Sequence, residues 1–493
     1  MSRYAHIKRS CPGGMASAME LAAIRKDEAR LIRGFLPGRY GALYSSHLMR
    51  WANGNNPTLW PQGMFWHLDP RQPPPSERSQ GVRNRNRLVT VEASALQVWT
   101  VRWRGAHDVP SLAPVTRLAF TPNLFQDWDH ASLGASMPFT HIVSVQVGDE
   151  TFFCAWPGSR VRRFIVDADG QPHVYECGMD APTDSSWSVA QSDWTGAEAN
   201  GDTGLTPALT YDYRVCWADE RQRLSSPSAT ESLTVTAQTR TADEVDSSLV
   251  RVVWPEDEQV RYAVIFRAAQ GTTNYYAITP YGADSIYVSR VGSETEGEAE
   301  DRTSEADLVL GDLAPQPGEN DQPPYASCLA WHGGRLWCDD RSYGAMLDNE
   351  AQYTDTESLR RVRCSNLNAP TQWNSVADVE DEALGVSLTV GADIGDRVAA
   401  IAGLGTALGV WRERSFYYIT GTSAADWTVE HAADVGCVHQ TAMTFVRGTP
   451  YWLAEDGVYT FSAPFVPVNV ALRVNNYFGG AQKGQTGSIE AGG

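Results

Sequence analysis

The last third of the chain consists of short apolar runs separated by tight turns, and this spacing constrains the fold more than any other feature. The runs are three to four residues long, too short for ordinary helices. They are Ala407–Val410, Phe416–Ile419, Thr444–Val446 and Tyr451–Leu453. Gly333-Gly334 and Asp456-Gly457 suit two-residue hairpin turns, which take positive φ at both central positions. The pattern predicts consecutive antiparallel hairpins and an all-β domain.

Strand patterns also occur in the first half of the chain. Val and Trp alternate with polar residues in Leu96–Trp103, which places one face of a strand inward. Two hairpins are then expected, His141–Val147 with Thr151–Trp156 and Arg163–Val166 with His173–Cys177. The loop Asp167–Gly170 has the Asp-x-Asp-Gly pattern of a calcium loop, but it lacks the further ligands and the terminal Glu of an EF-hand. We therefore interpret this loop as a turn.

Residues 205–310 have the pattern of an inserted module. Tyr211–Trp217 alternates cleanly, and Ser225-Ser226-Pro227-Ser228 follows after a turn. Further strands are expected at Leu233–Val235, Val250–Trp254, Tyr262–Phe266 and Tyr275–Ile278. This order resembles a fibronectin type III sandwich. The acidic run Glu294–Asp301 stands where a last strand would be, and with the prolines after it we interpret it as an exposed loop and linker.

Five fragments of the last third, taken in order, resemble a domain shared by tail and head-to-tail structural proteins of bacteriophages. The fragments are Gly334–Trp337, Ser365–Trp373, Gly395–Gly421, Gly436-Cys437 and Trp452–Phe461. The resemblance covers roughly residues 324–461 and is strongest for the tail nozzle (tubular) and packaged-DNA-stabilising proteins of short-tailed phages. It implies a β-propeller fold and a virion structural protein.

The resemblance implies a ring in the phage tail, with six-fold symmetry suiting the family, that contacts the adaptor or portal and touches genomic DNA only transiently. Such a protein is made in the host cytoplasm and resides in the virion. The propeller-like sequence amounts to roughly 270 residues, enough for five or six blades of about 40 to 50 residues. The expected segments are a basic arm with one helix (1–50), the first part of the propeller (51–204), the inserted sandwich (205–310), an acidic and proline-rich linker (311–324), the second part of the propeller (325–477) and a flexible, glycine-rich tail (478–493).

The net charge of −19 limits the ways in which the chain can meet nucleic acid. Proteins that grip duplex DNA neutralise its phosphates with Lys and Arg, so the chain as a whole is not expected to clamp DNA. An acidic wall would suit a conduit, because like charge keeps a moving polymer from adhering. The simpler alternative is that the charge only keeps a large particle soluble.

Residues 1–50 differ from the rest, with nine basic and three acidic side chains. Residues 15–35 are predicted to form an amphipathic helix, with Met19, Ala22, Leu31 and Phe35 on one face. Basic side chains surround that face: Arg25, Lys26, Arg30 and Arg33. They are candidates for a docking arm that meets an acidic neighbouring subunit or nucleic acid. The alternative is a capping helix with a solvated basic face.

The sequence contains no pattern that requires catalysis, a cofactor or a metal. There is no Gly-x-Ser-x-Gly elbow, His-Glu-x-x-His, P-loop or Rossmann glycine pattern. The eight cysteines include no Cys-x-x-Cys pair, so we expect small packing residues. No window approaches a membrane span. The acid pairs Asp339-Asp340 and Asp127/Asp129 are interpreted as turn acids rather than a glycosidase pair.

Two alternatives to a tail component stay open. A receptor- or glycan-binding propeller would use loop aromatics such as Trp128 and Trp187, whereas a propeller-type polysaccharide hydrolase would use paired carboxylates. Most of the 17 tryptophans, however, lie within strand patterns. We therefore expect the tryptophans to pack mainly between sheets.

Overall fold

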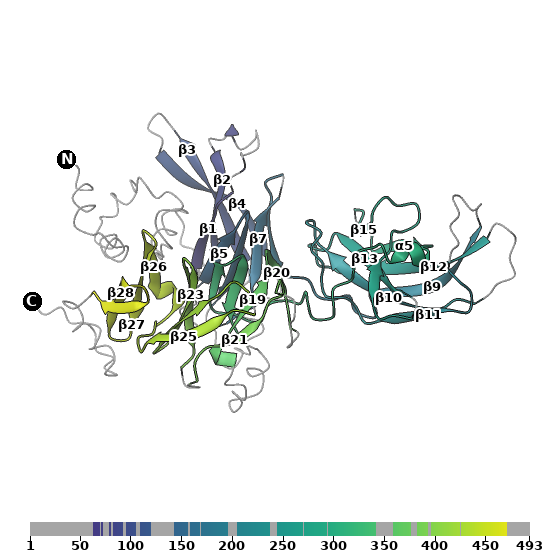
Figure 1. The fold of residues 1–493 in the computed structure, drawn as a ribbon. Coiled ribbons are helices and arrows are strands. Elements are labelled where there is room, and N and C mark those ends of the chain that lie inside the picture. The colour runs from purple at the N-terminus through teal and green to yellow at the C-terminus, as the bar shows by residue number, and fades with distance from the viewer. Residues whose placement is uncertain are drawn as a thin grey trace, which may run out of the picture. The chain divides into compact units, whose positions relative to one another are not determined.

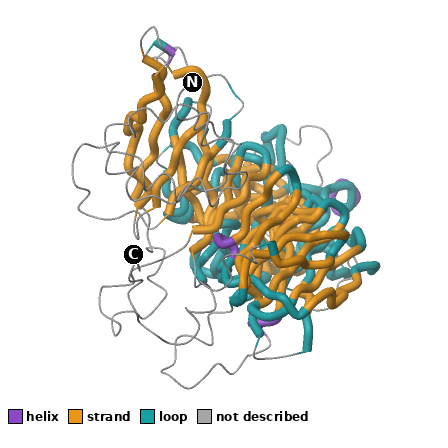
Figure 2. The backbone as a smooth tube through the Cα atoms, turned by 90° about the vertical axis from the view of Figure 1, so that its left-hand side faces the viewer, coloured by secondary structure: helices purple, strands orange, loops and turns teal. Residues whose placement is uncertain are grey.

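Strands dominate this protein, and the helices among the described residues are no more than a turn or so long (Figure 2). The computed structural model describes residues 63–69, 71, 78–79, 82–91, 95–104, 109–119, 142–155, 158–167, 169–195, 205–236, 244–269, 271–292, 294–341, 358–375, 382–392, 396–423 and 425–470. The chain divides into two compact units. Unit 1 comprises residues 1–174, 324–364 and 387–493, and unit 2 comprises 175–323 and 365–386.

The sheets of unit 1 are built from strands that follow one another along the chain and pair antiparallel with their neighbours (Figure 1). The first sheet is β1 (Gly63–His67), β2 (Val82–Val91), β3 (Ala95–Arg104) and β4 (Val109–Ala119). The second is β5 (Ile142–Val147), β6 (Glu150–Ala155), β7 (Arg162–Val166) and β8 (Pro172–Glu176).

Three further sheets follow residue 324 along the chain. In the first, β17 (Leu329–His332), β18 (Arg335–Asp339) and β19 (Arg361–Asn366) are joined by β20 (Ala369–Trp373) and β21 (Ser387–Thr389), which both pair with β19. The next is β22 (Val398–Leu404), β23 (Ala407–Arg412), β24 (Phe416–Thr420) and β25 (Thr428–Ala433). The last is β26 (Met443–Val446), β27 (Thr449–Ala454), β28 (Gly457–Ala463) and β29 (Val466–Asn469).

The first strands of these sheets lie against one another. β5 neighbours β1 on one side and β17 on the other, β17 neighbours β22, and the short η5 helix (Gln440–Ala442) before β26 contacts both β22 and β5. The Gln440 amide joins these elements by accepting from Leu329 N and donating to the carbonyl oxygens of Leu329 and Ile401. Four of the five sheets of unit 1 therefore share an inner layer made of their first strands, and η5, just before β26, adjoins it.

Aromatic side chains fill the space between adjacent sheets of unit 1. Trp411 and Phe416 from one sheet pack with Trp452 and Phe461 from the next, and the Trp411 and Trp452 ring centroids are 5.5 Å apart. Both tryptophans are buried, as are Trp99, Trp337 and Trp373. Burial is confirmed at these five positions, and packing between sheets is confirmed for Trp411 and Trp452. Burial of large aromatic surface stabilises the fold.

Unit 2 is a sandwich of two antiparallel sheets around one core. One sheet has the order β16 (Glu296–Asp301), β12 (Glu244–Val253) and β9 (Trp187–Thr195). The other contains β11 (Glu231–Thr234), β10 (Thr210–Ala218), β13 (Tyr262–Ala268), β14 (Tyr275–Ala277) and β15 (Tyr287–Ser289). Val250 and Val252 of β12 share a core with Tyr213 and Val215 of β10, so the two sheets pack face to face.

The strands predicted from apolar runs in the described residues are confirmed, with two corrections. The hairpin between β27 and β28 has Glu455 and Asp456 as its loop residues, because Gly457 already pairs with Ala454. Of the two predicted hairpin turns, only Gly333-Gly334 has positive φ at both of its central residues, at 59° and 75°.

The second correction concerns the acidic run interpreted as a loop and linker. Residues 296–301 of that run form β16, which pairs with β12. The strand forms because every second residue fits the core: Ala299 and Asp301 are buried, and Gly297 leaves room for Trp254 and Val252. Unit 2 thus begins before residue 205 and extends beyond residue 310, and β20 also belongs to it.

Candidate functional site

A buried carboxylate at the end of β18 organises the most connected polar cluster of unit 1. Asp339 accepts hydrogen bonds from Ser327 N at 2.7 Å, Ser327 Oγ at 2.6 Å and Cys328 N at 2.8 Å. Arg341 Nε donates to the same carboxylate at 2.6 Å. The other end of this guanidinium donates from Nη2 to the carbonyl oxygen of Val398 at 2.7 Å. The cluster therefore ties the entry to β17 and the end of β18 to the start of β22.

Charge in this cluster is balanced within a dry environment. Burial, the largest single cause, lowers the pKa of Arg341, but the charge and hydrogen bond of Asp339, with Cys328 and Glu413, together raise it above its usual value. Arg341 therefore stays charged, and the carboxylate accepts four hydrogen bonds. An acid so fully engaged is poorly placed to transfer protons. The Asp339-Asp340 pair is not a turn pair, because Asp339 is the last residue of a buried strand.

A second cluster of the same kind lies at the start of β22. Asp396 accepts from Ser415 Oγ at 2.5 Å and from Arg414 N at 2.8 Å, and the Arg412 guanidinium lies 3.7 Å away. Arg397 pairs with Glu413 nearby. A cavity of about 10 Å³ adjoins both clusters, and it is lined by Ser327, Arg341, Arg397, Val398, Ala399, Glu413, Val438 and His439. Such a volume holds about one water molecule and no substrate.

Thiols surround the Asp339 cluster but have no reactive environment. Cys154, Cys328 and Cys338 are buried, and burial raises the pKa of each. A thiol that stays protonated is a poor nucleophile and a poor metal ligand. The seven cysteines in the described part of the chain are buried, which confirms their packing role. In the part of the chain that the structure describes, no group of His, Cys, Asp and Glu side chains could hold a metal ion.

Unit 2 contains its own buried polar centre. Asp301 Oδ2 accepts from Arg267 Nη1 at 2.5 Å and from the Tyr213 hydroxyl at 2.9 Å, while Asp301 Oδ1 accepts from Thr303 N at 2.8 Å. Ser248 Oγ donates to the Tyr213 hydroxyl at 2.9 Å. Burial raises the pKa of Tyr213, and Asp301 adds to the effect. The cluster crosslinks the two sheets and is sealed from solvent.

Basic residues are concentrated in the first sheet of unit 1. The strands β2, β3 and β4 contain six arginines and no acidic residue, in a chain of net charge −19. The arginines are Arg83, Arg85, Arg87, Arg102, Arg104 and Arg117. We call the end of this sheet formed by residues 82–87, 100–104 and 109–113 the arginine projection. Figure 1 shows these strands extending beyond the other sheets of unit 1.

The residues proposed from sequence have different outcomes. Arg25, Lys26, Arg30 and Arg33, like the whole predicted arm and the glycine-rich tail, lie outside the described residues. Trp187 begins β9 and is 5% exposed, so it cannot contact a sugar; Trp128 lies outside the described part.

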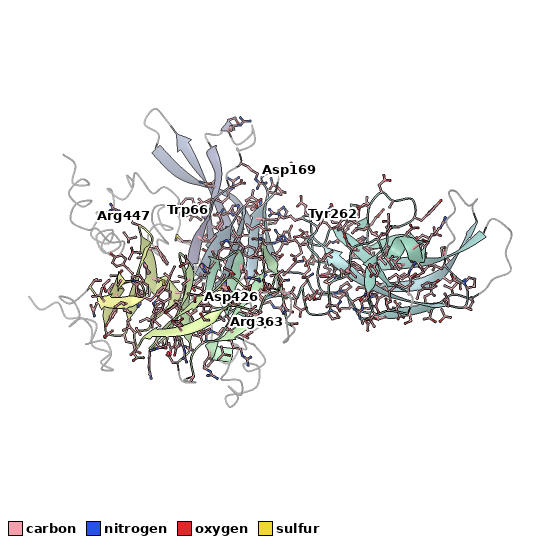
Figure 3. All side chains as sticks on the ribbon, viewed as in Figure 1. Trp66, Asp169, Tyr262, Arg363, Asp426 and Arg447 are labelled. Carbon is pink, nitrogen blue, oxygen red and sulfur yellow. The ribbon has the colours of Figure 1, made fainter. Side chains whose placement is uncertain are left out.

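The turn interpretation of residues 167–170 is confirmed. Gly170 N donates to the Asp167 carbonyl oxygen and Gly170 has a φ of 87°. The Asp167 carboxylate accepts from Gln171 N at 2.7 Å and lies 3.0 Å from His173 Nε2. Figure 3 labels Asp169 in this turn. The loop uses its first carboxylate to close the turn, which leaves that group engaged within the protein.

Two features escaped the sequence reasoning. The arginine projection could have been found, because Arg-Asn-Arg-Asn-Arg at residues 83–87 is visible as a basic repeat once charge is counted beyond residue 50. The Asp339 cluster had no comparable signature, since its members come from β17, β18 and β22 and meet only in the folded unit.

Comparisons with known proteins add little. No protein-family model matches the chain, and no curated protein matches it. Among solved structures, virginiamycin B lyase from Staphylococcus aureus is similar at 9% identity and a TM-score of 0.19, over 79% of this chain and 95% of that chain. The Neurospora crassa Pan2 WD40 domain gives 9% identity and a TM-score of 0.19, over 80% and 91%. Such low TM-scores carry no argument about this chain.

The sheets themselves define the class of protein. The described residues form an all-β protein with many four-stranded antiparallel sheets, consistent with a β-propeller-like fold. In the part of the chain that the structure describes, no helix is long and apolar enough to cross a membrane.

Proposed function

We propose that this chain is a virion structural protein, a nozzle or tube component of a phage tail. It forms a ring that extends the DNA channel below the portal and adaptor, helps to retain the packaged genome and passes it out during ejection. In this proposal unit 1 is a β-propeller and unit 2 is an inserted fibronectin type III-like sandwich. The work of the protein is mechanical and electrostatic, and no residue is assigned a catalytic role.

The observation that carries the proposal is the inner layer of unit 1. The first strands β1, β5, β17 and β22 lie side by side, and each begins a sheet whose later strands follow in chain order. A propeller arranges its blades radially in this way. The chain leaves unit 1 after its second sheet and returns for the third, which supports reading unit 2 as an insertion.

The fragments that resemble phage tail proteins also have structural reasons to occur together. Trp337, Trp373, Trp411 and Trp452, one from each of four fragments, are buried. In the remaining fragment, Gly436 passes so close to the backbone of β23 that a Cβ would lie 2.2 Å from the Glu413 carbonyl carbon. The Trp452 indole donates to the Gly436 carbonyl oxygen at 3.1 Å. The fragments therefore contribute buried core residues and one close backbone contact, which supports treating them as one motif.

A ring with closed cyclic symmetry would give the channel its tubular form. The chain carries a net charge of −19, so its surface as a whole repels DNA and favours passage over adhesion. The basic arm with Arg25, Lys26, Arg30 and Arg33 is then a natural docking element for an acidic neighbour, either another copy or the adaptor.

The test is electron microscopy of the purified full-length protein and of phage particles that contain it. Rings or tubes, and density for the protein below the portal, are expected. A chain that stays monomeric at high concentration and is absent from particles would overturn the proposal. A variant lacking residues 1–35 should keep its β-sheet circular dichroism but lose ring assembly or adaptor docking, whereas unchanged assembly would remove the role of the arm.

A further inference from the structure

The acidity of this chain resides in unit 2. Unit 2 contains 31 acidic and 9 basic residues and therefore carries −22, whereas unit 1 contains 28 acidic and 31 basic residues and carries +3. Residues 1–50 alone carry +6. A module with so much like charge repels copies of itself and attracts basic partners. Charge of both signs, suited to an association between copies, is therefore present in one chain.

Unit 2 leaves three large aliphatic side chains in water within a stretch of five residues. Val309, Leu310 and Leu313 are 48%, 82% and 61% exposed. They lie in residues 309–313, which we call the exposed segment, directly after α5 (Glu305–Leu308; Figure 1). A single exposed aliphatic residue needs no explanation, whereas a contiguous apolar patch marks an interaction site. Three such residues in so short a stretch favour an interaction site.

The exposed segment is held in place at both ends. Leu308, just before it, is buried in the core of the sandwich, and Ala314, just after it, is buried in a second apolar cluster. Backbone hydrogen bonds join the segment to β14, since Ala277 N donates to the Asp312 carbonyl oxygen and Ala314 N donates to the Tyr275 carbonyl oxygen, both at 2.8 Å. A fixed backbone therefore presents the exposed side chains, which lowers the entropic cost of binding a partner.

The surroundings of the exposed segment are acidic. Asp307 and Asp312 are exposed, and residues 303–323 contain five acidic residues but no Lys or Arg. The basic residue that precedes this stretch, Arg302, is buried and pairs with Glu300 at 2.8 Å. A partner that complements this surface therefore combines apolar side chains with basic ones.

We propose that the exposed segment binds residues 15–35 of a second copy of this chain. That stretch has the required chemistry, because basic side chains surround an apolar face formed by Met19, Ala22, Leu31 and Phe35 in the predicted helix. An amphipathic helix that buries its apolar face on a partner is a recurrent mode of recognition, and complementary charge fixes its orientation. The inference rests on the proposed function and deepens it, because it identifies the acidic neighbour of the arm as unit 2 of another copy.

The chain between the arm and the first described strand is long enough for such a contact. Residues 36–62 separate the arm from Gly63, where β1 begins, and a chain of that length spans at most about 90 Å. Each copy would give its arm to one neighbour and receive the arm of the other. Head-to-tail contacts of this kind generate a ring when the rotation between copies closes.

The first experiment locates the contact by photo-crosslinking in the full-length protein. Protein with Leu310→p-benzoylphenylalanine is mixed with isotopically heavy protein that lacks the photo-reactive group, and mass spectrometry identifies the crosslinked peptides. Crosslinks from position 310 to residues 15–35 of the heavy copy are expected. The matched control carries Val291→p-benzoylphenylalanine, at another exposed position of unit 2, and should give no crosslink to that stretch.

The second experiment measures self-association by sedimentation velocity. Leu310→Ser combined with Leu313→Ser should weaken self-association about tenfold or more, since two large apolar side chains no longer become buried on binding. The matched control is Val253→Ser combined with Val291→Ser, which removes two exposed valines of unit 2 and should change self-association by less than about twofold. Circular dichroism and melting temperature establish that both variants fold.

The outcomes separate this inference from the proposed function. Crosslinks from position 310 that stay within one copy, reach other segments or do not form would overturn the inference, as would equal weakening by both variants. Rings that form without the crosslink to residues 15–35 would leave the tail proposal intact and remove this site. Conversely, that crosslink between copies in a protein that never forms rings would support the site and remove the ring.

Discussion

The two units both consist of antiparallel sheets, but they connect their strands differently. In unit 1, β22 to β25 and β26 to β29 are consecutive both in the chain and in their sheets. In unit 2, β12 pairs with β9 and β16, so its neighbours are separated from it by intervening strands of the other sheet. Strand pairing within these two sheets of unit 1 therefore closes only short loops, whereas the pairing of β12 with β9 and β16 closes long ones, which costs more chain entropy and slows folding.

The units also place their buried charges differently. Asp339 and Arg341 of unit 1 are two residues apart, and the pair then reaches Val398 through one carbonyl contact. Arg267 and Asp301 of unit 2 come from opposite sheets and meet only after the sandwich has closed. We infer that the polar centre of unit 2 forms only when its two sheets pack together, whereas in unit 1 the charged pair lies at the end of one strand and its partners Ser327 and Val398 come from other segments.

The largest effect is expected from Asp301→Asn in unit 2. The substitution leaves the Arg267 guanidinium buried without its carboxylate, and breaking a buried pair in this way costs about 3–5 kcal/mol. Urea unfolding and limited proteolysis should show destabilisation concentrated in residues 175–323. Cleavage spread equally over both units would contradict the difference between them.

A pH effect of nearly this size is expected from His67 of unit 1. Burial lowers its pKa from 6.5 to about 4, and its Nδ1 lies 2.9 Å from Thr151 Oγ1. Between these values the unfolded chain binds a proton that the folded chain does not, so stability falls as pH falls through this window. The loss reaches about 3 kcal/mol near pH 4.

The measurement compares wild type with His67→Gln by urea unfolding at several pH values. The variant should lack this part of the pH dependence. The free energy of unfolding of the wild type should therefore fall relative to that of the variant as the pH is lowered. A difference that is constant from pH 7 to pH 4 would show that His67 is protonated alike in the folded and unfolded chains.

A smaller effect is expected where two segments of unit 1 touch through a glycine. Gly436→Ala would place a Cβ 2.2 Å from the Glu413 backbone, and relieving such a clash costs about 1–3 kcal/mol or more. Gly403→Ala is the matched control, because its Cβ would meet nothing closer than His332 Nδ1 at 3.3 Å. Melting temperatures should fall for the first and change little for the second.

The smallest effect is expected from Glu298→Gln on the surface of unit 2. Glu298 pairs with Arg251 at 2.8 Å, but both side chains are more than half exposed. Exposed pairs contribute about 0–1 kcal/mol. The variant serves as the surface counterpart of Asp301→Asn, since both substitutions act on β16. A loss as large as that of Asp301→Asn would show that burial does not set the energy of these pairs.

Much of the strand content could be read from the sequence because hairpins are local. Short apolar runs and tight turns gave β23, β24, β26 and β27 with small shifts at their ends. The acidic strand β16 could not be read in this way. Its outward residues are Glu296, Glu298 and Glu300, and its inward residues are small or charged, so its place depends on the groove beside β12.

The candidate sites also differ in how much of them can be read from the sequence. The basic repeat at Arg83 to Arg87 is a property of the sequence, but only the structure shows that it lies where β2 pairs irregularly with β3 and that Arg87 is buried. Likewise the sequence shows Asp339 beside Asp340, and only the structure shows Asp339 bound to Ser327 and Arg341.

By itself, the sequence determined the all-β class, the alternation of strands and turns, the packing role of tryptophan and cysteine, and the uneven distribution of charge. These follow from residue type and short-range spacing, which act on neighbours along the chain. Tertiary structure decided the two units, the inner layer of first strands, the strand β16 and the buried pairs Asp339–Arg341 and Arg267–Asp301. The reason is that desolvation and long-range strand pairing depend on which segments meet in space, and that information is absent from local pattern.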